Sequence, residues 1–347
     1  MKTILVTGAT GFLGRHLVGK LSQDGSRIRC IVRHPDKARN LLQRNIELVI
    51  GDLSNQEVAF NAVQGVDAIV HAAGQVGGWG NKEAYMRNNV VATRNLLEAC
   101  ASHGVKRFLF VSSVASYGLQ PGRLLTEESP AEFISDPYCQ TKLECENLVR
   151  HFSDRHRITA TVLRPSIIFG PFDRRFLRRV VEAVRSGTVV TVGKRNQGPP
   201  LVYVEDVVNF TAAILRSQST PFEIYNLSSP EDVSWERIVH EVSIQLRLRT
   251  RLVRIPFRLA YAAGSVLEFM WKLVRASRPP LVTRFRAALL GLSYQFDSSK
   301  ALSVPGFPGF TPFSTALDAS IRWIQQEEQL AATANRESQV RTSTSSD

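Results

Sequence analysis

The feature that most constrains the fold is a regular alternation of short apolar runs with longer amphipathic stretches. Six runs rich in β-branched residues divide the first half of the chain: Ile4–Thr7, Ile28–Arg33, Ile46–Asp52, Ala68–Ala73, Phe108–Ser113 and Thr159–Pro165. Apolar runs of this length are typical of parallel strands buried on both faces. Apolar spacings of three and four predict helices at Phe12–Leu21, Glu83–His103 and Pro137–His156. The pattern therefore predicts a doubly wound, parallel α/β sheet.

The second half of the chain is less regular. We expect residues 1–165 to form the sheet domain, and residues 166–328 to supply a smaller substrate-binding lobe interleaved with it. A basic helix is predicted at Phe172–Arg185, and the run Val202–Val207 leads into another helix. Residues 331–347 are polar and rich in Ser and Thr, so they are predicted to be disordered.

Composition narrows the class of protein and its compartment. A hydrophobic fraction of 44% and a charged fraction of 21% are typical of a soluble folded chain. The four cysteines are widely spaced without a CxxC pair, so neither a disulfide framework nor a metal site is expected. No signal peptide and no uninterrupted apolar window of about 18 residues is recognisable, which favours a cytoplasmic location.

The positive charge is concentrated in one segment. Of the net charge of +12, residues 241–290 contribute ten Lys or Arg against two Glu, a balance of +8. Aromatic residues do not alternate with these cations, so no nucleic-acid partner is expected. An apolar stripe in the same segment predicts a helix face: Ile255, Leu259, Ala263, Val266, Met270 and Leu273. Such a helix could cover a substrate cavity or contact a membrane surface peripherally.

A glycine-rich turn follows the first predicted strand and opens the first helix. The sequence Thr7-Gly8-Ala9-Thr10-Gly11-Phe12-Leu13-Gly14 has the spacing G-x-x-G-x-x-G. At this place a backbone turn can approach the pyrophosphate of a dinucleotide, provided that no Cβ intervenes. The candidate cofactor-binding residues here are Gly8, Thr10, Gly11, Phe12, Leu13 and Gly14. The alternative is a glycine-rich turn without a ligand.

The end of the second strand indicates which dinucleotide is preferred. An acidic residue there would accept from a free ribose 2′-hydroxyl, whereas a cation would bind a 2′-phosphate. Here the residue is Arg33, and Lys37 follows four residues later. We therefore expect NADP, with NAD as the alternative if Arg33 is only a surface cation.

Two further strand ends carry candidate cofactor contacts. Gly51-Asp52-Leu53 follows the third strand, and His71-Ala72-Ala73-Gly74 follows the fourth. Asp52 could accept from the adenine amino group, or it could cap a helix. Leu53 and the small residues Ala72, Ala73 and Gly74 would let the dinucleotide lie against the sheet edge.

The candidate catalytic residues are Ser113, Tyr138 and Lys142. Tyr138 and Lys142 stand four residues apart on a predicted helix, so they share one face. A nearby ammonium favours the phenolate, so we expect the pKa of Tyr138 to lie below its usual value of about 10. Ser113 ends the fifth strand and could polarise a carbonyl or alcohol. Neighbouring Ser112 should point to the opposite face of the strand.

Taken together, these motifs resemble the extended short-chain dehydrogenases of the NAD-dependent epimerase/dehydratase superfamily. TGATGFLG, GDL, HAAG, SSVASYG, YCQTK and LRPSIIFGP occur in that family's order, over roughly residues 1 to 325. The resemblance implies a Rossmann fold, a nicotinamide cofactor and a Ser-Tyr-Lys group. It adds Asn89, Pro165 and Ile168 as cofactor-side residues, and Thr141 replaces the more usual serine before the lysine.

The resemblance also implies a reaction and an assembly. Val76-Gly77-Gly78-Trp79-Gly80 and the Ile255-Pro256-Phe257 region are most similar to the 3β-hydroxysteroid dehydrogenase group. We expect hydride transfer between NADP(H) and a secondary alcohol or ketone on an apolar, sterol-like or β-hydroxy/β-keto acid substrate. The alternatives are a nucleotide-sugar epimerase or dehydratase with bound cofactor, and a dinucleotide-binding sensor without chemistry. The family often forms homodimers through the two helices at Glu83–His103 and Pro137–His156.

Overall fold

The computed structural model describes residues 2–41, 45–77, 81–132, 136–217, 220–274, 280 and 282–344. Its centre is a seven-stranded, all-parallel sheet in the order β11-β7-β5-β4-β1-β2-β3. The strands are β1 (Thr3–Thr7), β2 (Arg27–Val32), β3 (Ile46–Ile50), β4 (Ala68–His71), β5 (Arg107–Val111), β7 (Thr159–Pro165) and β11 (Phe222–Leu227). The chain runs outward from β1 to β3 on one side and from β4 to β11 on the other, which is the strand order of the predicted doubly wound sheet.

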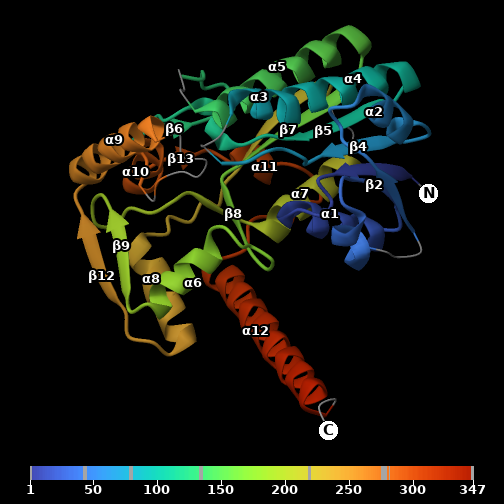
Figure 1. Cartoon of the computed structure of the whole chain (residues 1–347). Coiled ribbons are helices and arrows are strands. Elements are labelled where there is room, and N and C mark those ends of the chain that lie inside the picture. Colours follow the sequence, from blue (N-terminus) through green and yellow to red (C-terminus); the bar gives the residue numbers. More distant parts are fainter. Residues whose placement is uncertain are drawn as a thin grey trace.

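Helices cover both faces of this sheet (Figure 1). One layer holds α2 (Gln56–Val63), α4 (Ala92–His103) and α5 (Pro137–His156); the other holds α1 (Phe12–Gln23), α7 (Val204–Arg216) and the short α11 (Ser299–Leu302). Each layer packs an apolar cluster against its side of the sheet, with Leu17 and Phe210 on one side and Leu96 and Phe108 on the other, all four fully buried. The three-layer arrangement confirms the predicted Rossmann-type fold class.

The remaining elements build a second lobe beside the carboxyl edge of the sheet (Figure 1). Short parallel pairs join β8 (Ile167–Phe169) to β10 (Leu201–Tyr203), β9 (Thr188–Val192) to β12 (Arg251–Ile255), and β6 (Leu124–Leu125) to β13 (Gln295–Phe296). The helices are α6 (Leu177–Arg185), α8 (Trp235–Leu246), α9 (Phe257–Leu273) and α10 (Arg284–Gly291). The chain re-enters the central sheet at β11, so the lobe is interleaved with the sheet in sequence.

Two predicted helices differ from those observed. The stretch Glu83–His103 is divided into α3 (Lys82–Tyr85), a π-helical turn η2 (Met86–Val91) and α4. In the basic stretch Phe172–Arg185, helix α6 starts only at Leu177. The reason is Phe172, which has a positive φ of 70°, followed by Asp173, whose carboxylate accepts from the backbone amides of the next turn. The local cap thus overrides the helical periodicity.

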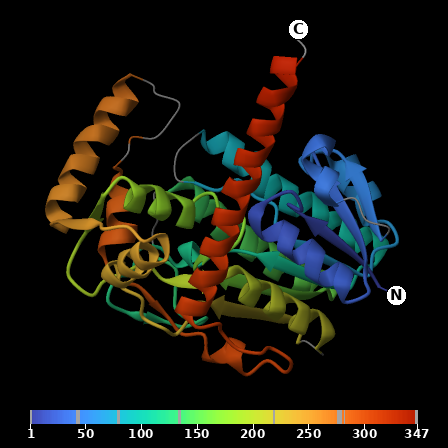
Figure 2. The same ribbon diagram turned by 90° about the horizontal axis from the view of Figure 1, so that it is seen from below.

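The tail predicted to be disordered, residues 331–347, is helical up to residue 344 in the structure. Helix α12 (Phe313–Thr344) continues through residues 331–344, while residues 345–347 lie outside the described residues. The first part of α12 buries Phe313, Leu317, Ile321 and Ile324 in the second lobe. Beyond this, the helix projects from the body of the molecule (Figure 2). Alanine, glutamate, glutamine and arginine favour helix in this stretch, although its composition lacks the apolar residues needed to form a core.

Candidate functional site

The glycine turn between β1 and α1 has the tight geometry that the sequence predicted. Gly8 adopts a φ of +71°, and a Cβ there would lie 2.8 Å from the backbone nitrogen of Ala73. A Cβ on Gly14 would lie 2.0 Å from the carbonyl oxygen of Gly8, so only glycine allows α1 to approach the turn this closely. The backbone amide of Gly11 donates to Gly8 O at 2.8 Å. This turn leaves the amino terminus of α1, formed by Phe12 and Leu13, open to an anion.

The neighbouring strand end is held against the glycine turn by a buried network. Thr7 Oγ1 accepts from the backbone amide of Ala73 at 3.0 Å and lies 2.7 Å from His71 Nδ1. His71 Nε2 lies 3.0 Å from Thr93 Oγ1, whose own proton goes to Asn89 O. Neutral His71 therefore donates through Nε2 and accepts through Nδ1. Burial, together with the charge of Lys142, lowers the pKa of His71 to about 3.

The adenosine side of the predicted site carries two cations in different surroundings. Arg33, directly after β2, is exposed, and its guanidinium lies 3.9 Å from the carboxylate of Asp52. Lys37 borders a small cavity against α1 together with Thr10 and Arg15. Asp52 does not cap α2; Asn55 does. The Asp52 carboxylate instead accepts from the amide of Ser54 at 2.8 Å, which leaves its outer oxygen directed to Arg33.

The three candidate catalytic residues are brought together at the carboxyl edge of the sheet. Asp136 caps α5 by accepting from the amides of Tyr138 and Cys139, with Pro137 in the first turn. This places Tyr138 near Ser113, whose hydroxyl opposes the rise in the pKa of the Tyr138 phenol. One turn later, Lys142 is buried, and its Nζ donates to Val111 O at 2.7 Å. A Cβ on Gly74 would lie 3.5 Å from the same Nζ, so the lysine faces the strand end on which the dinucleotide is expected.

The electrostatics of Tyr138 differ from the sequence expectation. Burial raises the pKa of Tyr138, with Ser113 and the charge of Arg175 opposing the rise, whereas Lys142 was expected to lower it. The ammonium is directed to the carbonyl of Val111 and lies 6.0 Å from the Tyr138 ring centre. Burial also lowers the pKa of Lys142, while Cys145 and Glu146 act in the opposite direction. In this structure Tyr138 is therefore a protonated phenol at neutral pH, suited to donate a proton.

Comparison with known proteins connects this geometry to a family. The model of the NAD dependent epimerase/dehydratase family matches residues 4–228, from the first strand of the sheet to just after the last. The chain belongs to this family. The family consists of enzymes, and the fold and motifs of this chain are those of the extended short-chain dehydrogenases.

Its relatives include enzymes with different substrates. The chain is 30% identical, over 86% of its length and 92% of the relative's, to 2-alkyl-3-oxoalkanoate reductase of Stenotrophomonas maltophilia. It is 27% identical, over 91% and 78%, to 3beta-hydroxysteroid-dehydrogenase/decarboxylase isoform 1 of Arabidopsis thaliana. Among solved structures, MoeE5 in complex with UDP-glucose and NAD is 25% identical with a TM-score of 0.76, covering 94% of this chain and 99% of that one.

The residues of this family member fit a bound dinucleotide. The glycine turn forms a cradle that a Cβ at position 8 or 14 would close. At the end of β7, Pro165 and Ser166 are buried, and Ser166 Oγ has no hydrogen-bond partner among the described residues. Ile168 follows in β8 and is partly buried. An orphaned hydroxyl beside Pro165 suits the carboxamide end of a nicotinamide.

Asn89 takes its position from the π-helical turn. Its Oδ1 accepts from the amide of Gln75 at 2.7 Å, and its Nδ2 donates to Thr141 Oγ1 at 3.0 Å. Thr141 in turn donates to Tyr138 O at 2.9 Å. The threonine in place of serine thus keeps the hydroxyl that connects Asn89 to α5. π-Turns are frequent at functional sites because the additional residue redirects one side chain.

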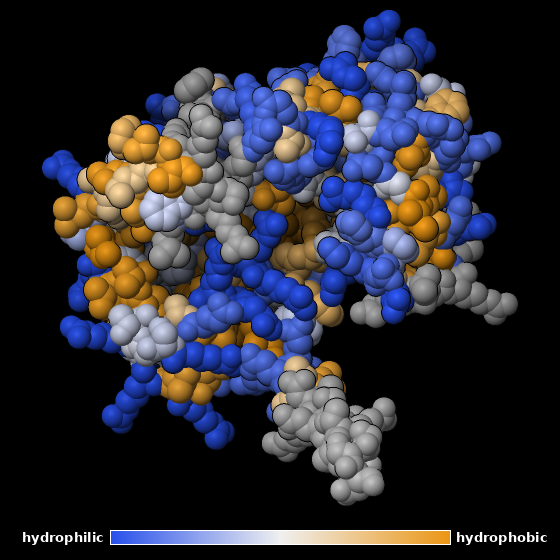
Figure 3. Space-filling view, in the orientation of Figure 1, coloured by the Kyte–Doolittle hydropathy of each residue, from blue (hydrophilic) through white to orange (hydrophobic). Residues whose placement is uncertain are grey.

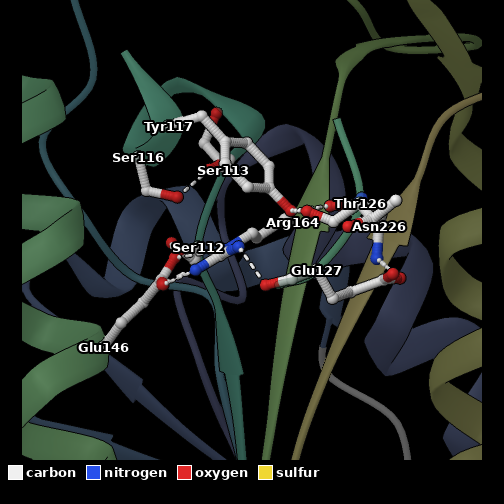
Figure 4. Close-up of polar contacts among 9 residues, drawn as sticks. All are labelled: Ser112, Ser113, Ser116, Tyr117, Thr126, Glu127, Glu146, Arg164 and Asn226. Atoms are coloured by element: carbon white, nitrogen blue, oxygen red, sulfur yellow. Dashed lines mark hydrogen bonds and ion pairs between the residues drawn. The ribbon is translucent and has the colours of Figure 1, made fainter. Parts of the chain in front are cut away.

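Sequence reasoning missed a buried ion pair, formed by Glu146 and Arg164, near Ser113 (Figure 4). The carboxylate of Glu146, one turn after Lys142 on α5, accepts two hydrogen bonds from Arg164 of β7. They come from Nε at 3.1 Å and from Nη2 at 2.6 Å. Ser112 Oγ also donates to Glu146, so Ser112 and Ser113 do point in different directions. The Arg164 guanidinium stacks 4.3 Å from the ring centre of Tyr117. No signal in the sequence joins Glu146 on α5 to Arg164 on β7, because the two residues meet only when the helix packs on the sheet.

The phenol of Tyr117 extends the same network to the second lobe. It contacts Thr126 O and Asn226 Oδ1, each at 2.8 Å, and burial raises its pKa to about 12. In the described part of the chain, no group of three or more His, Cys, Asp or Glu side chains could hold a metal ion. The segment Gly78–Gly80, which contributed to the 3β-hydroxysteroid dehydrogenase resemblance, lies outside the described residues.

Proposed function

We propose that this chain is a dehydrogenase or reductase that transfers a hydride between NADP(H) and a secondary alcohol or ketone. The observation that carries the proposal is the grouping of Ser113, Tyr138 and Lys142 at one strand end, where Ser113 acts on the pKa of the Tyr138 phenol and Lys142 is buried one turn further along α5. When bound, the nicotinamide supplies or accepts the hydride. Ser113 and Tyr138 hold the substrate oxygen between two hydroxyl groups, and Tyr138 gives or takes its proton.

The protonation state of the catalytic group favours the reducing direction. A protonated Tyr138 can donate to the developing alkoxide of a ketone, while Ser113 polarises the carbonyl. Lys142 holds the edge of β5 in place through Val111 O and faces the cofactor side. The exposed Arg175 brings a positive charge toward Tyr138 from the second lobe. Such a charge suits a β-keto acid, which would agree with the oxoalkanoate reductase among the relatives.

The preference for NADP over NAD rests on Arg33 and Lys37. No acidic residue occupies the end of β2, and the exposed Arg33 guanidinium is free to turn from Asp52 toward a 2′-phosphate. MoeE5 was solved with NAD, so the choice of NADP is a proposal for this chain. Titrating the protein with NADPH and NADH, and repeating with Arg33→Glu, tests it. A variant that binds NADPH as well as the wild type would overturn it.

The first assay follows absorbance at 340 nm with NADPH or NADH and a panel of β-keto acids, sterol ketones and nucleotide sugars. Consumption of coenzyme with a ketone supports the proposal. Tyr138→Phe should then lower turnover by about 10² to 10⁴, because the proton donor is lost, and leave coenzyme binding nearly unchanged. Tyr225→Phe is the matched control outside the site. Full turnover by Tyr138→Phe contradicts the catalytic assignment.

A nucleotide-sugar epimerase or dehydratase is the second candidate, favoured by the similarity to MoeE5. Such an enzyme would use the same three side chains but return the hydride to its product in each cycle. Conversion of a nucleotide sugar without net change at 340 nm would select it. Coenzyme binding without any turnover would instead support the dinucleotide sensor.

A further inference from the structure

Helix α9 carries an apolar face that no other part of the described chain covers. One side of the helix packs against α10: Ala260 is buried, and a Cβ on Gly264 would lie 2.9 Å from the backbone nitrogen of Arg284. The apolar stripe predicted from the sequence lies on another side of α9, and it faces solvent and not a cavity. The large side chains exposed on this face are Leu259, Val266, Met270 and Leu273 of the stripe together with Phe269, and Val274 follows directly after the helix.

The exposure of this face is high and concentrated. Leu273 is 76% exposed and Phe269 is 71% exposed. The helix lies at the margin of the molecule, away from the central sheet (Figure 2), and apolar side chains gather there on the surface (Figure 3). Single exposed apolar residues are ordinary, but a contiguous row along one helix marks an interaction surface.

The charges around α9 indicate the chemistry of the partner. Arg258 is exposed on α9 and Arg284 on the adjacent α10; Arg247, Arg249 and Arg251 are exposed too, but they lie before or at the start of β12, the strand whose other end leads into α9. The two acidic residues between positions 241 and 290, Glu241 and Glu268, are both in ion pairs, with Arg237 and Arg284. A second copy of this chain would bring a second segment of the same positive charge, and the two would repel. An anionic surface instead complements it.

We propose that α9 docks on an anionic phospholipid membrane, with its apolar face in the headgroup and acyl boundary and the flanking arginines on lipid phosphates. The helix would lie in the plane of the membrane: among the described residues, none forms a helix long and apolar enough to cross it. Because α9 belongs to the second lobe, docking would place that lobe, and not the glycine turn, next to the lipid. The proposal does not depend on the reaction that the enzyme catalyses.

The experiment is co-sedimentation of the full-length chain with phosphatidylcholine vesicles, prepared with and without phosphatidylglycerol. The test variant is Leu273→Glu, and the control is Leu330→Glu, which makes the same charge change at a leucine of α12 that is 73% exposed. We expect binding only to the anionic vesicles, weakening with salt, and reduced roughly tenfold or more by Leu273→Glu but not by Leu330→Glu. Light scattering without lipid records the oligomeric state of each protein.

Three outcomes would overturn the proposal. The first is a wild-type protein that stays in the supernatant with anionic vesicles at low salt. The second is equal binding by the Leu273→Glu and Leu330→Glu variants, which would make the attraction non-specific. The third is a wild-type dimer that Leu273→Glu converts to a monomer without any lipid binding, which would assign the face to a second copy of the chain.

Discussion

At the scale of single residues, burial decides the chemistry of the site more than the spacing of charges does. Tyr138 and Lys142 stand one turn apart as the sequence indicates, yet burial keeps the phenol protonated. His71 is a second example, because its two nitrogens are both committed to threonine hydroxyls in the core. A buried group whose pKa differs between the folded and unfolded states makes the free energy of unfolding, as well as catalysis, depend on pH.

His71 should make the stability of the fold depend on pH. Its folded pKa of about 3 lies below the unfolded value of 6.5, so the unfolded state binds the proton more readily. Stability is therefore present above pH 6.5 and is lost as the pH falls toward 3. Between pH 7 and pH 5 this group should remove about 2 kcal/mol from the free energy of unfolding. Urea unfolding at each pH measures it.

The variant His71→Asn should lose this part of the pH dependence, although it will be less stable at pH 7. His34→Asn, at an exposed position, controls for the loss of an imidazole. If His71→Asn and the wild type lose equal stability between pH 7 and pH 5, the imidazole is not the group responsible.

The Glu146–Arg164 pair should be essential to the fold behind the site. Glu146→Gln leaves the Arg164 guanidinium buried without its counter-charge, which should lower the free energy of unfolding by about 3–5 kcal/mol. The exposed pair of Arg123 and Glu132 is the comparison, and Glu132→Gln should cost at most about 1 kcal/mol. Denaturant unfolding of both variants measures the difference. Similar losses would mean that the buried pair contributes no more to the free energy of unfolding than a surface pair does.

At the scale of elements, the turn between β1 and α1 and the π-turn before α4 set the positions of the site residues. The glycine turn is readable from the sequence because its backbone leaves no space for a side chain. The π-turn cannot be predicted from the sequence, because its residues have the pattern of an ordinary α-helix. Only the contacts of Asn89 with Gln75 and Thr141 favour the additional residue of the π-turn.

Two glycines of the same helix should respond oppositely to alanine. Gly14→Ala places a methyl group against Gly8 O, so we expect loss of coenzyme binding by at least tenfold and reduced stability. Gly19→Ala has open space and should stabilise α1 by about 0.5–1 kcal/mol. Coenzyme titration measures the change in affinity, and denaturant unfolding measures the change in the free energy of unfolding. Normal coenzyme binding by Gly14→Ala would show that the turn can relax around a side chain.

At the scale of the whole molecule, two clusters on the sheet faces and a third in the second lobe form the core. The third cluster depends on the start of α12, which returns to the lobe after the chain has completed the sheet. The homodimer through α4 and α5 stays a prediction, and the light-scattering measurement described for α9 also tests it. The cytoplasmic location likewise stays a prediction.

Stability should depend on the first half of α12 only. A chain that ends at Ala332 should keep the free energy of unfolding within about 0.5 kcal/mol of the wild type. Ile321→Ala should cost about 2–5 kcal/mol, because Ile321 is fully buried in the third cluster. Thermal and denaturant unfolding compare the two proteins. A large loss on truncation would mean that residues beyond Ala332 contribute to folding.

The sequence by itself determined six of the seven strands of the central sheet, the glycine turn and the positions of Ser113, Tyr138 and Lys142; the seventh strand, β11, was not predicted. These features follow from local rules: strand and helix periodicity, steric exclusion of a Cβ, and the four-residue repeat of a helix face. Only the tertiary structure decided the protonation of Tyr138, the π-turn at Asn89, the Glu146–Arg164 pair and the outward direction of the α9 stripe. Each of these depends on which distant segments pack together, and desolvation and pairing energies arise only when they do.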